Sequence, residues 1–311
     1  MKGLGAFAFG GLVGTPVRAG TEVPGAASTV AIAQSTKVFG HTQLQPRQVA
    51  ELVHSAVMAA TGERTEKDAY SKLFRPDDVV GIKLNCLDSR IAPHPEVVEA
   101  LASGLLMAGV KPSNILAWDR RRSEVLAAGF PEQPKSFRIT GTDRSYGEVV
   151  ENGVVGSRLS NILEDCTALI NVPVLKDHDL AGVSICLKNW FGAIDNPNKY
   201  HFDKLHPALV DLSELAEIRG KLRLNLCDGI VTVYNGGPAY KEQWAERTGM
   251  ILASTDSVAL DFVGHRRIEE MRKAHGLKSL KLAGREPAYI ALAARKGLGN
   301  ADDSRVKVVT T

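Results

Sequence analysis

The chain has 311 residues, of which 44% are hydrophobic and 23% charged, and its formal net charge is only +3. These proportions are typical of a soluble globular protein, and the length suffices for one large α/β domain or two small ones. The basic residues are scattered, whereas nucleic-acid binding usually needs a concentrated basic face, so we expect no nucleic-acid partner. Because no run of about 20 apolar residues occurs, we also expect no stable membrane span.

Residues 1–34 differ in composition from the rest of the chain. A charged start precedes an apolar run rich in Gly and Ala, from Leu4 to Val13, and small residues follow near Ala19. This is the layout of an export signal, and we predict export to the periplasm, with a disordered tail on a cytoplasmic protein as the alternative. The modest hydrophobicity suggests the twin-arginine route, in which Met1-Lys2 would end a motif that starts upstream.

From residue 46 onward, apolar positions alternate between helical and strand periods. Helices are predicted at 46–60, 96–108, 123–129, 157–165, 207–219, 258–274 and 286–295. Strands are predicted at 77–85, 115–118, 168–175, 221–226, 249–253 and 305–309, with a possible continuation of the fourth over 230–234. The first strand, the helix 96–108 and the second strand form a β-α-β unit, which implies a parallel pair with a right-handed crossover.

This alternation predicts an α/β fold with a mainly parallel sheet and helices on both faces. We expect one large domain over residues 35–311. The segment 131–156 contains four glycines and predicts an irregular insertion, either a lid or a minor β-rich element.

Polar side chains recur where the predicted strands end. They are Lys83 and Asn85, Asp119, Lys176 and His178, Asp228, and Asp256. Binding sites of open α/β sheets form at the carboxyl ends of strands, so these residues suggest one cleft. Asp256 could instead cap the helix after it. The arginine run 120–122 suits either an anion contact or a solvated helix start, and we favour the second.

The stretch from Ala168 to His206 has the highest density of such residues. Its blocks Asn171-Val-Pro-Val-Leu-Lys-Asp-His178 and Leu187-Lys-Asn-Trp-Phe-Gly192 resemble the signature of the family known as domain of unknown function 362. The segments Val80–Asn85 and Ala253–Asp261 match two further blocks, so the resemblance runs from about Pro76 to about Gly276. The family name implies no activity, so the chemistry has to be argued from the residues.

Some relatives in that family are associated with ferredoxin-like iron–sulfur modules. Such a module needs clustered cysteines, whereas the four cysteines here are dispersed, at Cys86, Cys166, Cys186 and Cys227. We therefore expect no iron–sulfur cluster within this chain. Buried thiols are the favoured interpretation, and a disulfide stays open in an oxidising compartment.

The favoured function is an enzyme that binds a small anionic ligand and uses lysine and histidine for acid–base chemistry. We expect His178, Lys176 and Lys188 to be catalytic, because an imidazole with a pKa near ~6.5 exchanges protons readily and a lysine of lowered pKa can act covalently. The expected substrate-binding residues are Lys83, Asn85, Asn189, Asp228 and Asp256. The pattern has a fold-level analogy to the nickel-pincer lactate racemases, which use a lysine-tethered cofactor and paired histidines.

Two alternatives remain open at this point. A metal-dependent enzyme could use His178 with the candidate ligands His201, Asp203 and His206, although a polar loop explains that spacing slightly better. A periplasmic binding or accessory protein without catalysis would need the same charged cleft. The sequence does not identify a cofactor.

Overall fold

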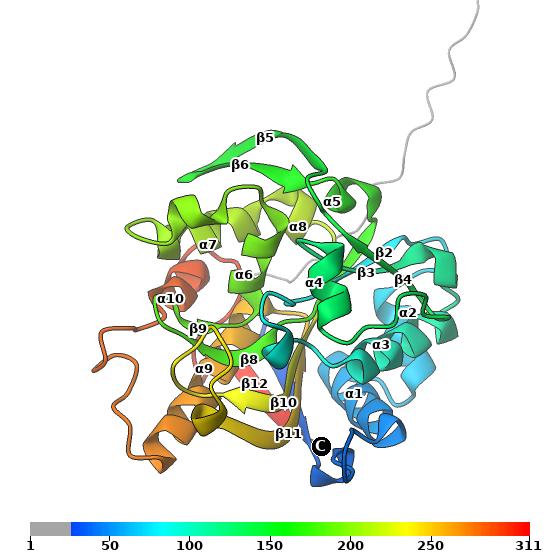
Figure 1. Ribbon diagram of the computed structural model, residues 1–311, viewed down its shortest axis with the longest axis horizontal. Coiled ribbons are helices and arrows are strands. Elements are labelled where there is room, and N and C mark those ends of the chain that lie inside the picture. The colour runs from blue at the N-terminus through cyan, green and yellow to red at the C-terminus, as the bar shows by residue number, and fades with distance from the viewer. Residues whose placement is uncertain (1–25) are drawn as a thin grey trace, which may run out of the picture.

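The fold is built on a ten-stranded sheet in this computed structural model, which describes residues 26–311 (Figure 1). The strand order is β12-β1-β11-β10-β7-β2-β3-β4, and β8 and β9 extend the sheet beside β10. The strands are β1 (Ser28–Gln34), β2 (Val80–Lys83), β3 (Ile115–Asp119), β4 (Arg138–Gly141), β7 (Ala168–Asn171), β8 (Val174–His178), β9 (Gly182–Ser184), β10 (Leu222–Val233), β11 (Ala245–Ser254) and β12 (Val306–Thr310).

The sheet is mostly parallel, as the sequence predicted. Strands β4, β3, β2, β7 and β10 pair in parallel, and so do β8 with β10 and β12 with β1. β11 runs against both of its neighbours, β10 and β1. The chain that follows β11 therefore continues toward the amino ends of β10 and β7, away from the residues that follow β2, β3 and β7.

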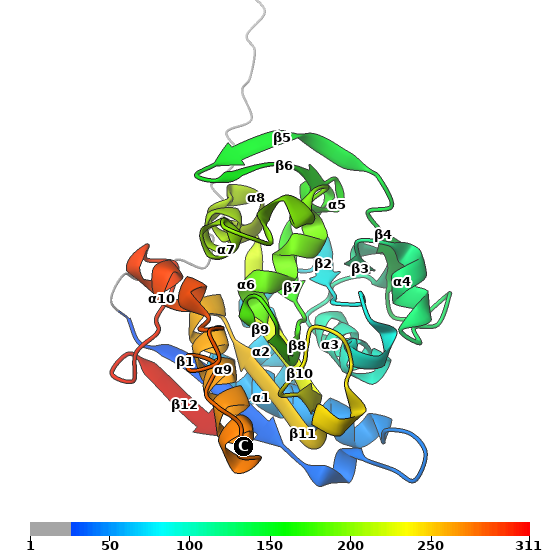
Figure 2. The same ribbon diagram turned by 60° about the vertical axis from the view of Figure 1, so that its left-hand side comes forward.

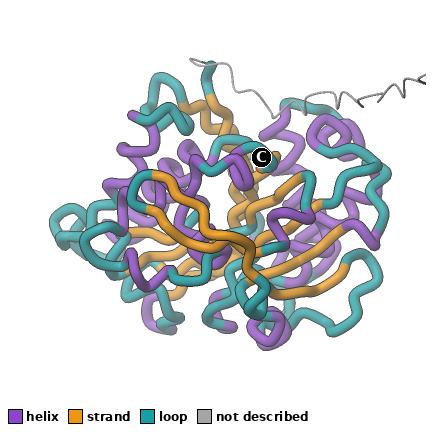
Figure 3. Tube along the Cα trace, turned by 90° about the horizontal axis from the view of Figure 1, so that it is seen from above, coloured by secondary structure: helices purple, strands orange, loops and turns teal. Residues whose placement is uncertain are grey.

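Helices cover both faces of the sheet, which confirms the predicted α/β class (Figures 2 and 3). One face packs against α1 (Pro46–Thr61), α2 (Glu66–Leu73), α3 (Pro95–Met107) and α4 (Arg122–Ala127). The other face packs against α5 (Ile162–Asp165), α6 (Cys186–Asn189), α7 (Leu205–Glu214), α8 (Ala216–Arg219), α9 (Ser257–Ala274) and α10 (Ala288–Arg295).

The strands contribute alternate side chains to these two cores, because successive side chains of a strand point to opposite faces. In β11, Ile251 and Ala253 join the core under α1 to α3, whereas Leu252 joins the core under α9. In β1, Ala33 likewise joins the core under α1 to α3, and Ile32 joins the core under α9. None of the helices in residues 26–311 has the length and apolarity that a membrane crossing requires.

The start of the folded domain differs from the sequence prediction. Strand β1 pairs with β11 and β12, so Ser28–Gln34 belongs to the sheet and the boundary predicted at residue 35 is too late. A short apolar run next to a leader-like segment has no local signal that distinguishes a strand from more leader. The predicted export signal itself lies mostly outside the described residues.

Other elements also differ from their predicted bounds, and the helix predicted over 207–219 is divided into α7 and α8 at Leu215. The strand predicted over 168–175 is divided into β7 and β8 at Pro173, which has no N–H to donate to a sheet. The first half of the helix predicted over 157–165 is strand, because β6 (Val155–Ser160) pairs with β5 (Tyr146–Asn152), and only the second half, α5, is helical. The insertion is thus a two-stranded sheet, while β4 before it joins the main sheet.

A buried carboxylate from α9 positions the short helix α6. Asp261 is completely buried, and its two oxygens accept the backbone N–H groups of Cys186 at 2.6 Å and of Leu187 at 3.2 Å. Burial raises the pKa of Asp261 to about 7 although these N–H groups favour the ionised form. A four-residue helix is not stable by itself, so this contact fixes where α6 begins and where Lys188 lies.

We predict that Asp261→Asn destabilises the protein. The amide presents an NH2 group where one carboxylate oxygen stood, so one buried backbone N–H loses its acceptor, at a cost of about 1–3 kcal/mol. Urea unfolding at neutral pH measures this difference in free energy. The matched control is Asp77→Asn, at an exposed aspartate. Equal stability of the two variants would show that Asp261 does not anchor α6.

Candidate functional site

A cavity of about 150 Å³ opens at the edge of the sheet where β2, β3 and β8 end. Most of the residues predicted to form a site line it, although they come from four separate segments of the chain. They are Lys83 and Asn85 after β2, Lys176 and His178 of β8, Lys188 and Asn189 of α6, and His201. The parallel direction of β2, β3 and β8 explains this convergence, because their carboxyl ends share one edge.

Two of the predicted substrate-binding residues do not line this cavity. Asp228 lies in the middle of β10, where its carboxylate accepts the backbone N–H and the ring Nδ1 of His94, both at 2.8 Å. Asp256 follows β11, so it lies away from the cavity edge of the sheet. There it caps α9 by accepting the N–H groups of Val258 and Ala259, which confirms the capping alternative.

Lys83 lines the cavity and forms an ion pair with a carboxylate. Its Nζ lies 2.6 Å from Asp119 Oδ1, and both side chains are almost completely buried. The other carboxylate oxygen of Asp119 accepts the N–H of Cys86 at 2.6 Å. A Cβ at Gly192 would lie 2.6 Å from Lys83 Nζ, so a larger residue there would displace this ion pair. Lys83 therefore contributes a neutralised charge rather than a free ammonium group.

Lys176 and Lys188 are the uncompensated charges of the cavity. They are 2% and 9% exposed, and neither has a carboxylate oxygen at ion-pair distance within residues 26–311. Lys176 Nζ donates to Asn85 Oδ1 at 2.8 Å. Lys188 Nζ lies 3.5 Å from His201 Nε2 and 4.3 Å from the centre of the Phe191 ring.

This environment lowers the pKa of both amines. Burial lowers the pKa of Lys176 to about 8. Burial, and then repulsion by Lys176, lowers the pKa of Lys188 to about 7. At neutral pH a substantial fraction of Lys188 is therefore the free amine, which can accept a proton or attack a carbonyl.

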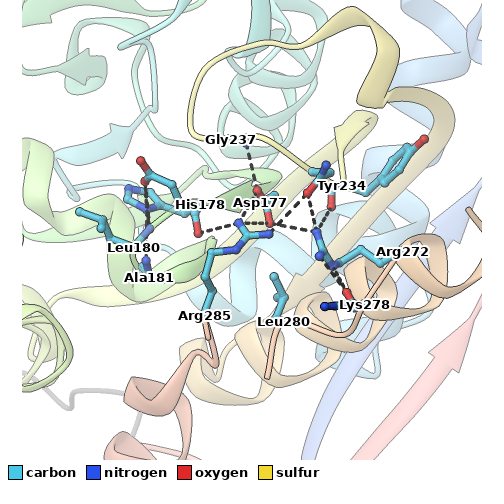
Figure 4. A network of polar contacts seen from close by, with 12 residues as sticks. Asp177, His178, Leu180, Ala181, Tyr234, Gly237, Arg272, Lys278, Leu280 and Arg285 are labelled. Atoms are coloured by element: carbon cyan, nitrogen blue, oxygen red, sulfur yellow. Dashed lines mark hydrogen bonds and ion pairs between the residues drawn. The ribbon is translucent and has the colours of Figure 1, made fainter. Parts of the chain in front are cut away.

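His178 is held as a neutral ring. Its Nδ1 accepts the backbone N–H groups of Leu180 at 3.1 Å and Ala181 at 3.2 Å, so the ring proton is assigned to Nε2 (Figure 4). Asp179 Oδ1 lies 3.0 Å from Nδ1, but both atoms accept from Leu180, so this contact is not an ion pair. Burial, followed by Lys188 and His201, lowers the pKa of His178 to about 2. This geometry suits a hydrogen-bond donor rather than the expected acid–base group.

A chain of asparagine amides connects the cavity to the sheet beneath it. Asn85 donates to Asn189 at 3.1 Å, Asn189 donates to Asn171 at 2.8 Å, and Asn171 donates to Asn225 at 3.1 Å. The sequence analysis assigned no role to Asn171 or Asn225. The motif around Asn171 was the available signal for the first, whereas nothing near Asn225 in the sequence marks it.

A buried ion-pair network holds the end of β8 in place on the side away from the cavity (Figure 4). Asp177 points away from the cavity because strand side chains alternate, and both its oxygens lie 2.9 Å from Arg285 Nη1. Asp177 also accepts the N–H of Gly237 at 3.0 Å, and Arg272 Nη1 lies 3.6 Å away. No sequence motif marks these arginines, and only the tertiary structure brings them to Asp177.

Only two of the candidate metal ligands come together, because His178 and His201 line the same cavity with 6.3 Å between their ring centres. His201 lines the cavity, Asp203 is exposed on the following loop, and the His206 ring stacks on Tyr289 with 6.0 Å between ring centres. Across residues 26–311, no group of three or more His, Cys, Asp or Glu side chains is arranged to hold a metal ion. The four cysteines are buried and unpaired.

Comparison with known proteins gives two partial likenesses. The Thylakoid-associated protein sll1697 of Synechocystis sp. (strain ATCC 27184 / PCC 6803 / Kazusa) is 27% identical over 202 residues. That match covers 61% of this chain and 62% of the relative, so the chain spans less than two thirds of the relative's length. The lactate racemase apoprotein from Thermoanaerobacterium thermosaccharolyticum aligns with a TM-score of 0.49 at 12% identity, covering 78% of this chain and 57% of that one.

The match to a family is broader. The family described as Domain of unknown function (DUF362) matches residues 80–266, a span that holds every residue lining the cavity as well as Asp261. The resemblance noted in the sequence is thereby confirmed. Because the match covers more than half of the 311 residues, the protein belongs to the DUF362 family.

Proposed function

We propose that the protein is an enzyme that binds a small organic anion in this cavity and transfers a proton through Lys188. The observation that supports this most directly is the burial of Lys188 beside Lys176 with no carboxylate partner in the described chain. Two like charges in a poorly solvated cavity repel each other, and a bound anion would relieve that repulsion. The anionic ligand thus replaces the carboxylates that buried lysines usually have.

The surrounding groups suit three separate tasks. Lys176, oriented by Asn85, supplies positive charge for the anion. The neutral His178 offers its Nε2–H as a donor to a carbonyl or carboxylate oxygen, and its ring cannot compete for the transferred proton. A base with a pKa near 7 beside a neutral donor is suited to proton transfer next to a carbonyl group. A binding protein without catalysis would need no base of this kind.

The first prediction of this proposal concerns the protonation of Lys188. An ordinary lysine has a pKa of about 10.4, whereas we expect Lys188 to titrate near pH 7, because burial and Lys176 both disfavour its charge. The pH dependence of the side-chain signals of 13C-labelled lysine in NMR spectra reports the midpoint. The Lys188 signal is assigned by its loss in Lys188→Met. Lys176→Met should raise the midpoint by removing the repulsion, and a wild-type midpoint above pH 9 would refute the proposal.

The second prediction concerns anion binding, with acetate as the probe and calorimetry as the measurement. Lys176→Met and Lys188→Met should each weaken binding by about tenfold or more, the size expected for one charge-assisted hydrogen bond. His178→Gln keeps an N–H donor and should retain most of the affinity that His178→Ala loses. Lys307→Met, at an exposed lysine, is the control. Equal affinity in all five variants would rule out this cavity as the anion site.

We also propose that the protein is exported, on the basis of the composition of its first residues. The expected result is an in-frame Arg-Arg pair in the bases upstream of Met1 and recovery of the protein in the periplasmic fraction. Fractionation compares the native protein with a form in which the upstream pair is changed to Lys-Lys. Absence of the pair together with recovery in the cytoplasm would refute export.

A further inference from the structure

A second cavity, of about 530 Å³, adjoins the first. The two share the walls formed by Arg120, Pro197 and Asn198. We call the second cavity the arginine vestibule; its other walls are Arg121, Asp143, Arg144, Tyr146, Asp195 and Asn196. The first cavity has room for a small group alone, whereas the vestibule has room for the rest of a larger molecule.

Two arginines of the vestibule, both at exposed positions, form no ion pair within the described chain, although two carboxylates also line this cavity. Arg120 pairs with Glu124. The carboxylate of Asp143 accepts the backbone N–H of Arg122, and the carboxylate of Asp195 accepts that of Arg158. By contrast, the guanidinium groups of Arg121 and Arg144 have no hydrogen bond or ion pair with any residue of the described chain.

Arg144 is held in a strained backbone conformation. Its φ is +110°, in a region that residues other than glycine rarely adopt. The turn is fixed by three backbone hydrogen bonds, from Thr142 to Asp119 O at 3.1 Å, from Asp143 to Arg120 O at 3.0 Å and from Ser145 to Thr142 O at 2.7 Å. A conformation of this kind persists where its surroundings impose it, and such positions cluster at ligand sites.

The turn also packs closely against the chain that carries Arg121. A Cβ at Gly141 would lie 2.1 Å from the backbone nitrogen of Arg122, so this approach requires glycine. The two unpaired arginines are thus brought to one cavity by backbone contacts between the segments that follow β3 and β4. Tyr146 adds a hydroxyl donor, and burial raises its pKa, which keeps the hydroxyl protonated.

We propose that the arginine vestibule binds a second anionic group of the substrate, a phosphate or a carboxylate, through Arg121 and Arg144. The substrate class is then an organic acid with two anionic groups, one on Lys176 and Lys188 and the other in the vestibule. Planar guanidinium groups suit this task because they bind either kind of oxyanion with two parallel hydrogen bonds. This inference rests on the anion site proposed above.

Calorimetric titration with one-headed and two-headed probes tests the vestibule. The probes are acetate, with one anionic group, and glutarate and 3-phosphoglycerate, with two. We expect at least one two-headed probe to bind wild type about tenfold or more tighter than acetate. The double variant Arg121→Gln/Arg144→Gln should lose this advantage and keep its acetate affinity. Arg64→Gln, at an exposed arginine elsewhere, controls for the loss of charge.

The outcomes separate the two proposals. If acetate binding depends on Lys188 but neither two-headed probe binds more tightly, or the double variant keeps the advantage, the vestibule proposal is overturned and the anion site stands. If acetate binding does not respond to Lys188→Met, both proposals fail. Arg144→Gly gives an independent check, because it relieves the strain while removing the guanidinium. It should raise the melting temperature and weaken the two-headed probe, and an unchanged affinity would also overturn the vestibule proposal.

Discussion

The cost of removing lysine ammonium groups from water is the physical constraint on which this site depends. Three lysines lie buried at one edge of the sheet, and an isolated buried charge is strongly unfavourable unless it is paired or loses its proton. Lys83 is paired with Asp119, whereas Lys176 has an amide partner and Lys188 has an imidazole and a phenyl ring as neighbours. The lowered pKa values of these two lysines are the direct consequence of this arrangement.

The carboxylates near the cavity hold the structure around the two lysines rather than neutralising them. Asp261 binds the first N–H groups of α6, which carries Lys188. Asp177 binds Arg285 behind β8, which carries Lys176. Asp228 binds His94 at the start of α3. Each acid is therefore occupied by another element, and the charge of the cavity remains available for a ligand.

Much of this arrangement could be predicted because it follows from local patterns. Alternating strand and helix periods predicted a mainly parallel α/β sheet, and helices such as α1 and α9 lie within a few residues of their predicted bounds. Parallel strands share one carboxyl edge, so polar residues after β2 and within β8 were expected to meet, and Lys83, Lys176 and Lys188 do line one cavity. The residues supporting them were missed where no motif marked them, as with Asn225 and Arg285.

The sequence by itself determined the periodicity of each segment, and with it the fold class and the edge at which the lysines gather. The tertiary structure decided the directions and partners of the strands, because an apolar run has the same pattern whichever way it pairs. Because β11 is antiparallel to β10, Asp256 lies away from the cavity edge. Pairing with β11 makes residues 28–34 a strand, although their composition resembles that of the leader-like segment before them. The tertiary structure also decided the charge states of His178 and of the buried lysines. Burial and the nearby Lys188 keep His178 neutral, and two backbone N–H groups occupy its Nδ1. The carboxylate of Asp119 reaches Lys83, whereas no carboxylate of the described chain reaches Lys188, because burial and contacts set a pKa and sequence spacing does not.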